Sequence, residues 1–284
     1  MRQNRFLAVL FTVLLTSTAF AGCSQSSGTQ NSTAVSSGAV SSASASGSTS
    51  DSLLKQIKAK GVVLVGTEGT YSPFSYHDAG NKLVGFDVEI AEAVGKELGV
   101  KTQFVETKWD SMIAGLDAKR FDIVFNQVGV TNERKQKYDF STPYTVTRAA
   151  LVVHSDNQDI KTFNDLKGKK SAQSLTSDFA QMAQKYGAQL VGTDGFNQSA
   201  DLVISKRADA TINDDIAFYD YKKQKSDAPL KIAATLADAS QNAALVRKGN
   251  ESFVKAVDDA LAKLAADGTL SQISNKYFGK DVTK

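Results

Sequence analysis

A segment that combines one arginine with hydroxyl and amide side chains follows an apolar run. The run is FDIVF (121–125), which has the composition of a buried strand, and the segment is QVGVTNERKQKYDFSTPY (127–144). Arg134 within it carries a planar guanidinium, which can donate two parallel hydrogen bonds to a carboxylate. An arginine beside Glu133 can also form an ordinary surface ion pair. The segment is therefore a candidate anion site, with a surface ion pair as the alternative.

A second polar segment, SLTSDF (174–179), stands directly before a predicted helix. The first turn of a helix leaves backbone N–H groups without intrahelical partners, and these groups can bind an anion. Thr176 and Ser177 are the hydroxyl residues beside them. The Ser177 hydroxyl can contact a ligand there, or it can cap the helix.

Aromatic side chains follow two of the predicted strands. Tyr71 and Phe74 flank Pro73 after the first strand, and Trp109, the only tryptophan of the chain, begins a helix after the second. Aromatic residues at strand ends favour a flat, partly apolar wall in a ligand site. For Phe74, packing in the core is an equal alternative.

Catalytic and metal chemistry have little support in the sequence. His77 and His154 lie far apart without a metal-ligand spacing, and a single cysteine cannot form a disulfide or a cysteine-rich metal site. No nucleophile elbow and no glycine-rich phosphate loop is present. We interpret Glu68, Asp87 and Glu89 as solvated or helix-supporting charges. We expect a binding protein without metal or cofactor rather than an enzyme.

The length and the charge restrict the class of protein. A chain of 284 residues is long enough for one to two compact units. Its 33 basic and 30 acidic residues leave a net charge of +3, which is too small and too evenly spread for a nucleic-acid surface.

The N-terminal region has the features of a targeting sequence. Two arginines, a short apolar stretch and small residues predict a secretory signal peptide over residues 1–22. The sequence Phe20–Cys23 resembles the bacterial lipoprotein processing box, in which Cys23 would be lipidated, although a cysteine can also occur there incidentally. Residues 23–50 contain mostly Ser, Gly, Ala and Thr, which predicts a flexible tether. We therefore expect an extracytoplasmic protein anchored to the membrane.

The remaining chain alternates between strand and helix signals. Apolar runs and turn residues predict strands at 61–69, 101–107 and 121–125, and apolar periodicity predicts helices at 52–57, 84–99 and 109–120. This order predicts an α/β protein with a mostly parallel sheet. Ligands bind such sheets where loops leave the carboxyl ends of the strands.

The alternation starts again after residue 148. Strands are predicted at 149–154, 189–194, 208–214 and 243–249. A short helix and turn are predicted at 163–170, a helix at 197–206, and a C-terminal pair of helices at 251–268 and 270–279. A brief polar strand and a helix are predicted within 171–187. We predict two lobes, lobe 1 with residues 51–146 plus 243–284 and lobe 2 with 147–242. Two chain crossings at one place predict a hinge, and a cleft between lobes is a preferred ligand site.

Four stretches carry a family resemblance: EGTYSPFSYHDAGNKLVGFDVEIAEAVGKELG, TKWDSMIAGLDAKRFDIVFNQVGVTNERKQKYDFSTPY, DLKGKK and ADGTLSQISNKYFGKDV. They resemble the polar-amino-acid solute-binding proteins of ABC importers, and among these the cystine-binding members. The resemblance covers residues 52–284. It implies a two-lobe periplasmic-binding-protein-like (type II) fold with an interlobe cleft. It further implies a monomer that captures an L-amino acid, with L-cystine favoured, for an ABC permease.

The resemblance also implies a role for individual residues. Arg134 would clamp the ligand's α-carboxylate, helped by the Thr131 hydroxyl, and Gln127 and Gly129 would present backbone groups. Asp214 would bind the α-ammonium, because a buried ammonium needs a negative partner. The neighbouring Asp215 should point the opposite way.

Two positions depart from the family pattern. Gly129 stands where the family usually has Ser or Thr, and Ser174-Leu175-Thr176 replaces a sequence that is commonly glycine-rich. These departures concern substrate specificity. Cyclohexadienyl dehydratases resemble the same family, so an extracytoplasmic enzyme is one alternative, and an adhesin or sensor is another.

Overall fold

The structure is a computed structural model that describes residues 52–283, with the side chains from Leu53 onward. The predicted signal peptide, Cys23 and the predicted tether lie outside the described residues. Within the described part of the chain, no helix is long and apolar enough to cross a membrane.

The first sheet has five strands in the order β5-β1-β6-β15-β7. Its strands are β1 (Val62–Thr67), β5 (Lys101–Glu106), β6 (Ile123–Val124), β7 (Tyr138–Phe140) and β15 (Leu245–Arg247). β1 pairs in parallel with β5 and β6, whereas β15 pairs antiparallel with β6 and β7. The predicted mostly parallel sheet is confirmed for β1, β5 and β6, and β15 is the strand that departs from it. β15 returns from the second sheet without a crossover helix, so it runs opposite to its neighbours.

Helices cover this sheet because their apolar residues recur at helical spacing. They are α1 (Ser52–Lys60), α2 (Phe86–Glu97), α3 (Trp109–Asp117), α8 (Glu251–Ala266) and α9 (Thr269–Phe278). A further short helix, α4 (Asn132–Lys137), has no apolar residue and no buried one. In α2, Phe86, Ile90 and Val94 follow at four-residue intervals and all three are buried. α8 and α9 both pack against α2.

A small three-stranded sheet holds the turn that follows β1. It consists of β2 (Thr70–Tyr71), β3 (Ser75–His77) and β4 (Leu83–Val84). The first N–H groups of α2 bind this turn, since Phe86 N donates to Pro73 O at 3.0 Å and Asp87 N to Phe74 O at 2.9 Å. The helix therefore fixes the backbone around Tyr71.

The second sheet has the order β11-β10-β12-β9-β13. Its strands are β9 (Ala149–His154), β10 (Lys170–Gln173), β11 (Gln189–Gly192), β12 (Ala210–Asp214) and β13 (Leu230–Thr235), and its helices are η2 (Phe163–Leu166), α5 (Asp178–Lys185), α6 (Phe196–Ile204) and α7 (Asp215–Gln224). β10 pairs in parallel with β11 and β12, and β9 pairs antiparallel with β12 and β13. The sequence analysis missed α7 and β13, because neither has a strong apolar periodicity.

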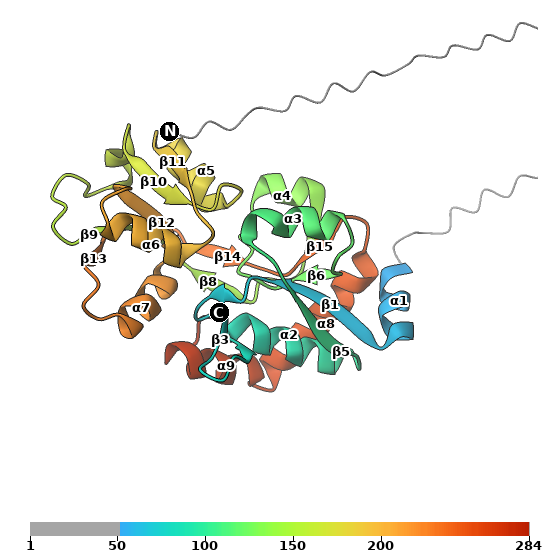
Figure 1. Ribbon diagram of the computed structural model, residues 1–284. Coiled ribbons are helices and arrows are strands. Elements are labelled where there is room, and N and C mark those ends of the chain that lie inside the picture. Colours follow the sequence, from blue (N-terminus) through green and yellow to red (C-terminus); the bar gives the residue numbers. More distant parts are fainter. Residues whose placement is uncertain (1–51, 284) are drawn as a thin grey trace, which may run out of the picture. The chain divides into compact units, whose positions relative to one another are not determined.

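Two short strands carry the chain between the sheets. β8 (Thr145–Thr147) and β14 (Ser240–Asn242) pair antiparallel, with Thr145 opposite Asn242, and they lie between the two sheets in Figure 1. We call residues 52–144 and 243–283 half 1, and residues 148–239 half 2. The lobe boundaries and the hinge of the sequence analysis stay predictions.

The contact between α2 and the Tyr71 turn generates the first prediction. Gly85 has φ +138°, and a Cβ there would lie 2.2 Å from Phe74 O. We expect Gly85→Ala to lower the free energy of unfolding by about 2–4 kcal/mol, since it adds a steric clash to a strained backbone. Urea unfolding measures the change.

Gly99→Ala is the matched control. Gly99 also has a left-handed backbone, with φ +69°, but a Cβ there would meet nothing within 4 Å. Its cost should be about 1 kcal/mol, from the backbone alone. Equal losses in the two variants would contradict the role given to the clash.

Candidate functional site

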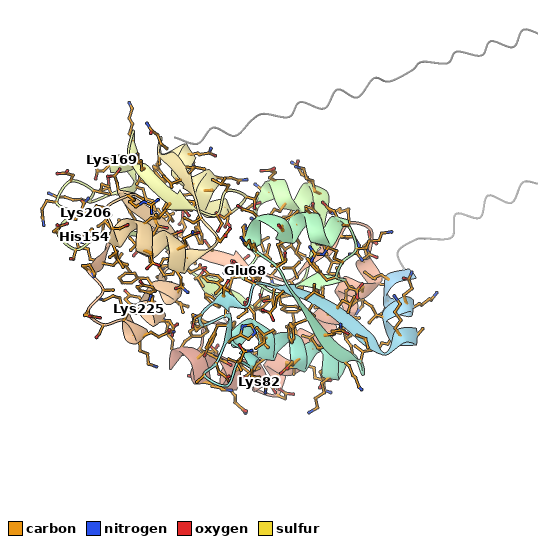
Figure 2. All side chains as sticks on the ribbon, in the orientation of Figure 1. Glu68, Lys82, His154, Lys169, Lys206 and Lys225 are labelled. Carbon is orange, nitrogen blue, oxygen red and sulfur yellow. The ribbon has the colours of Figure 1, made fainter. Side chains whose placement is uncertain are left out.

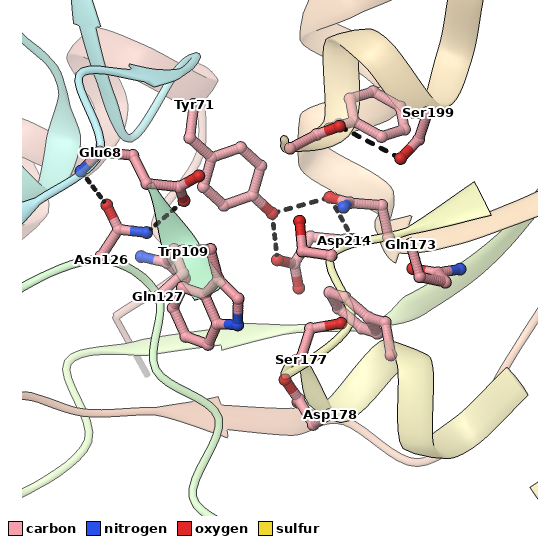
Figure 3. Close-up of a pocket in the computed structure, with 15 residues that line it drawn as sticks. Glu68, Tyr71, Trp109, Asn126, Gln127, Gln173, Ser177, Asp178, Ser199 and Asp214 are labelled. Atoms are coloured by element: carbon pink, nitrogen blue, oxygen red, sulfur yellow. Dashed lines mark hydrogen bonds between the residues drawn. The ribbon is translucent and has the colours of Figure 1, made fainter. Parts of the chain in front are cut away.

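A small cavity lies at the carboxyl ends of strands from both sheets. Its lining residues follow β1, β6, β10 and β12 or begin α3, α5 and α6, which is where the strand order predicts a ligand site. The cavity measures about 50 Å³, enough for only a few water molecules. Figure 3 shows the side chains that line it.

The structure brings half of the predicted site residues to this cavity. Those that line it are Tyr71, Trp109, Gln127, Ser177 and Asp214. Those that lie outside its lining are Phe74, Gly129, Thr131, Arg134 and Thr176.

Asp214 is a buried carboxylate without an ion pair among the described residues. One of its oxygens accepts a hydrogen bond from Thr147, and the Tyr71 hydroxyl lies 2.7 Å from the other. Burial is the main cause that raises the pKa of Asp214 to about 7, and the nearby charges of Asp178 and Asp215 act in the same direction. A cation at this place would stabilise the ionised carboxylate.

Asp215 points away from the cavity, as the strand alternation predicted. Its Oδ1 accepts hydrogen bonds from Arg148 N and Ile216 N at 3.3 and 2.9 Å. Asp214 therefore faces the cavity, whereas Asp215 accepts hydrogen bonds from backbone N–H groups outside it.

Glu68 is a second cavity carboxylate, and the interpretation of it as a solvated or helix-supporting charge is wrong. It lies between the halves, whereas the labelled Lys82 and Lys169 lie at the outside of the protein (Figure 2). Asn126 Nδ2 donates to its Oε2 at 2.6 Å, and burial raises the pKa of Glu68 to about 7. Its place directly after β1 was the signal in the sequence, because strand ends face the ligand site.

Gln127 takes part in a buried network rather than offering its side chain to the cavity. Its backbone N and its Nε2 donate to Asp87 at 2.8 and 2.6 Å, and its Oε1 accepts from Asn242. Asp87 is fully buried and burial raises its pKa to about 7, so the interpretation of Asp87 as a solvated charge is wrong. Asn242 also donates to Thr147, which donates to Asp214. A hydrogen-bond chain thus runs from Asp87 to Asp214 through both crossing strands.

The three predicted hydroxyl residues are already engaged within the protein. Ser177 caps α5 by accepting from Ala180 N at 3.0 Å, and Thr131 caps α4 by accepting from Arg134 N at 3.2 Å. Thr176 donates its hydroxyl to Asp110 Oδ1 at 2.8 Å. For Ser177 the capping alternative is the one that the structure shows.

Arg134 lies at the edge of the cavity. Its guanidinium carbon is 5.4 Å from the centre of the Trp109 ring, and its Nη1 donates to Gly129 O at 2.9 Å. The same nitrogen lies 3.4 Å from Asp178 Oδ1. Only 11% of the Arg134 side chain is exposed, which does not fit the alternative of a surface ion pair with Glu133.

Phe74 belongs to the core rather than to the cavity wall. Its side chain is fully buried and packs against Phe86 and Phe278. Its ring centre lies 4.9 Å from that of Tyr71. Phe74 therefore supports the aromatic residue that does line the cavity.

The described residues contain no group of three or more His, Cys, Asp or Glu side chains arranged to hold a metal ion. The cavity instead presents carboxylates, amides and aromatic rings, with one guanidinium at its edge. These groups can bind a small organic molecule that carries both charges.

Comparisons with known proteins agree with this chemistry. Residues 63–280 match the family of bacterial extracellular solute-binding proteins, family 3. The L-cystine-binding protein TcyA of Bacillus subtilis is 48% identical over 82% of this chain and 87% of its own length.

Two solved structures extend the comparison. The L-cystine solute receptor of Neisseria gonorrhoeae, in an unliganded open conformation, is 49% identical, with a TM-score of 0.55 over 82% of this chain and 99% of that one. An ancestral arginine-binding protein bound to arginine is 36% identical, with a TM-score of 0.73 over 77% and 99%. These structures have the type II periplasmic-binding-protein fold, which confirms the predicted fold class.

The raised pKa values predict how stability depends on pH. Glu68, Asp87 and Asp214 have pKa values of about 7 in the folded protein, against about 4 when unfolded. Between these values the folded state holds protons that the unfolded state releases, and this stabilisation is lost as the pH rises through 7. We expect the free energy of unfolding without added ligand to fall by at least about 2 kcal/mol from pH 5 to pH 8.

Urea unfolding at four pH values in this range tests the expectation. Asp214→Asn should flatten the curve, because one of the three groups no longer titrates. Asp215→Asn should change the curve's slope much less, because Asp215 acts on Asp214 only as a neighbouring charge. A stability that stays constant or rises toward pH 8 would refute the assignment.

Proposed function

Since this chain belongs to the bacterial extracellular solute-binding proteins, family 3, we propose that it captures an L-amino acid, with L-cystine favoured, for import by an ABC permease. The similar relatives are named as binding proteins rather than as enzymes, which supports a solute-binding protein. The observation that carries the proposal is that one cavity with aromatic walls has a buried carboxylate, Asp214, in its lining and a shielded guanidinium, Arg134, at its edge.

Asp214 and Arg134 match the two charges that every free amino acid carries. The α-ammonium would replace the Tyr71 hydroxyl as the partner of Asp214. The ligand would thereby supply the cation that the buried carboxylate lacks among the described residues. The α-carboxylate would bind Arg134, whose second terminal nitrogen leaves room for a bidentate pair. Trp109 lines the cavity, and its ring lies beside the Arg134 guanidinium. The ring would pack against the aliphatic part of the ligand.

Glu68 supports a ligand with a second amino group. L-cystine has an ammonium and a carboxylate at each end of its disulfide. A cavity that presents Glu68 in addition to Asp214 can serve both ammonium groups. The relatives named as L-cystine-binding proteins support the same ligand.

Binding requires the halves to separate and close. A cavity of about 50 Å³ cannot admit cystine, and Tyr71 of half 1 contacts Asp214 of half 2 directly. The TM-score is higher for the arginine-bound structure than for the more identical open receptor. We propose that β8 and β14 form the hinge, and that the ligand stabilises the closed arrangement.

The location proposed for the protein is outside the cytoplasm, anchored to the cell membrane as a lipoprotein. The extracellular family supports export. Cys23 would carry the lipid, residues 23–50 would act as the tether, and the chain would work as a monomer. The lipid anchor allows the binding part to reach the permease without leaving the membrane surface.

The first test removes each charged partner of the amino acid. Arg134→Ala and Asp214→Asn should each weaken L-cystine binding at least about 100-fold, because each leaves a ligand charge unpaired in a shielded site. Isothermal titration calorimetry of the full-length chain, freed of carried-over ligand by refolding, measures the affinity.

Arg120→Ala and Asp215→Asn are the matched controls. Arg120 is exposed, and Asp215 is adjacent to Asp214 but faces away from the cavity. Both controls should bind as the wild type does. Wild-type affinity in Arg134→Ala or Asp214→Asn would remove that residue from the site, and turnover of a ligand would favour an enzyme.

A second test concerns the second amino group. Glu68→Gln should weaken L-cystine binding by about 10- to 100-fold. It should weaken binding of the mixed disulfide of L-cysteine and propanethiol much less, since that ligand has a single ammonium. Equal losses for both ligands would show that Glu68 does not bind the second ammonium.

A further inference from the structure

We propose that Asp178 is an internal competitor for the ligand's α-carboxylate. In this structure the Asp178 side chain contacts Arg134, and a ligand carboxylate must displace or share that contact. The inference rests on the proposed function, because it takes Arg134 as the residue that binds the carboxylate.

The contact between the two side chains is shielded from solvent. Arg134 Nη1 lies 3.4 Å from Asp178 Oδ1, and 11% and 24% of the respective side chains are exposed. The same nitrogen donates to Gly129 O. Charges that are partly removed from water attract each other more strongly than exposed ones, so this contact competes more effectively than a surface ion pair.

The helix that carries Asp178 provides a second attraction. Asp178 is the first residue of α5, directly after the cap Ser177. The unpaired N–H groups of a first helical turn favour a negative charge. The guanidinium of Arg134 and the start of α5 are the two groups expected to attract a ligand carboxylate. Asp178 contacts the first and belongs to the second.

Gly129 provides the space for this carboxylate. A Cβ at position 129 would lie 2.4 Å from Asp178 Oδ2. The backbone of Gly129 is not in the left-handed region, so a side chain there is opposed by space and not by conformation, and it would require the Asp178 carboxylate to move. The Ser or Thr of the family pattern at position 129 would therefore meet the Asp178 carboxylate, whereas the glycine of this chain leaves room for it.

The competing contact also joins the two halves. Asp178 belongs to half 2, while Arg134 and Gly129 belong to half 1. The contact between Asp178 and Arg134 therefore stabilises the closed arrangement of the halves without a ligand. A ligand carboxylate that displaces Asp178 gains only the difference in free energy between its own contact with Arg134 and the contact that Asp178 loses. The affinity for a carboxylate ligand is lower than the site without Asp178 would give.

Asp178→Asn tests the competitor role directly. Asparagine keeps the size of the side chain and removes its charge. In calorimetric titrations of the full-length chain, we expect L-cystine to bind about three- to tenfold more tightly. An affinity that is unchanged or weaker would overturn the proposal, and weaker binding would indicate that Asp178 itself holds the ligand.

Asp194→Asn is the matched control. Asp194 of half 2 pairs with Lys108 of half 1 at 2.5 Å, so it also joins the halves. It does not contact Arg134. Its substitution should not tighten binding, and an equal gain in affinity would show that loosening the halves, rather than freeing Arg134, explains the effect.

A measurement without ligand separates this inference from the proposed function. A double-mutant cycle with Arg134→Ala and Asp178→Asn, followed by thermal unfolding, should show that the two shifts in midpoint do not add. Additive shifts in the unfolding midpoint would show that Arg134 and Asp178 do not interact, which would overturn the proposal. If the wild type binds no amino acid, the proposed function fails and the competitor role with it. Coupling without tighter binding would overturn the competitor role alone.

Discussion

The structure depends on one electrostatic constraint, which is the burial of carboxylates that have no cationic partner among residues 52–283. Asp214 and Glu68 face the same cavity, and burial raises the pKa of both to about 7. Such groups destabilise the folded state at neutral pH. A cationic ligand removes this cost, so part of the free energy of binding comes from relief of a penalty that folding has left in place.

The scaffold keeps these carboxylates in position through neutral hydrogen bonds. Thr147 and Tyr71 bind Asp214, and Asn126 binds Glu68. Thr147 lies on a crossing strand and shares Asn242 with Gln127. The crossing strands therefore connect the halves and also orient a site residue, so a movement between the halves would change the surroundings of Asp214.

The sequence was sufficient for the fold class and for the strand-end location of the site, because both follow from apolar periodicity and from chain order. It located Asp214 and Trp109 at the cavity. It left Phe74 open between the cavity wall and the core, because the burial of this residue depends on packing against Phe86 and the distant Phe278. It failed for Glu68, because the burial of a charged residue between two halves is a property of their mutual contact and has no local pattern.

Trp109 gives the protein an intrinsic fluorescence signal that comes from a single tryptophan. It is the only tryptophan in the chain, it lines the cavity, and its ring lies under the guanidinium of Arg134. Emission excited at the red edge of the absorption band therefore originates at a single point rather than as an average over the molecule. Opening of the halves, exchange of Asp178 for a ligand, and entry of water would each change that emission, so unlabelled protein can report its own occupancy in real time.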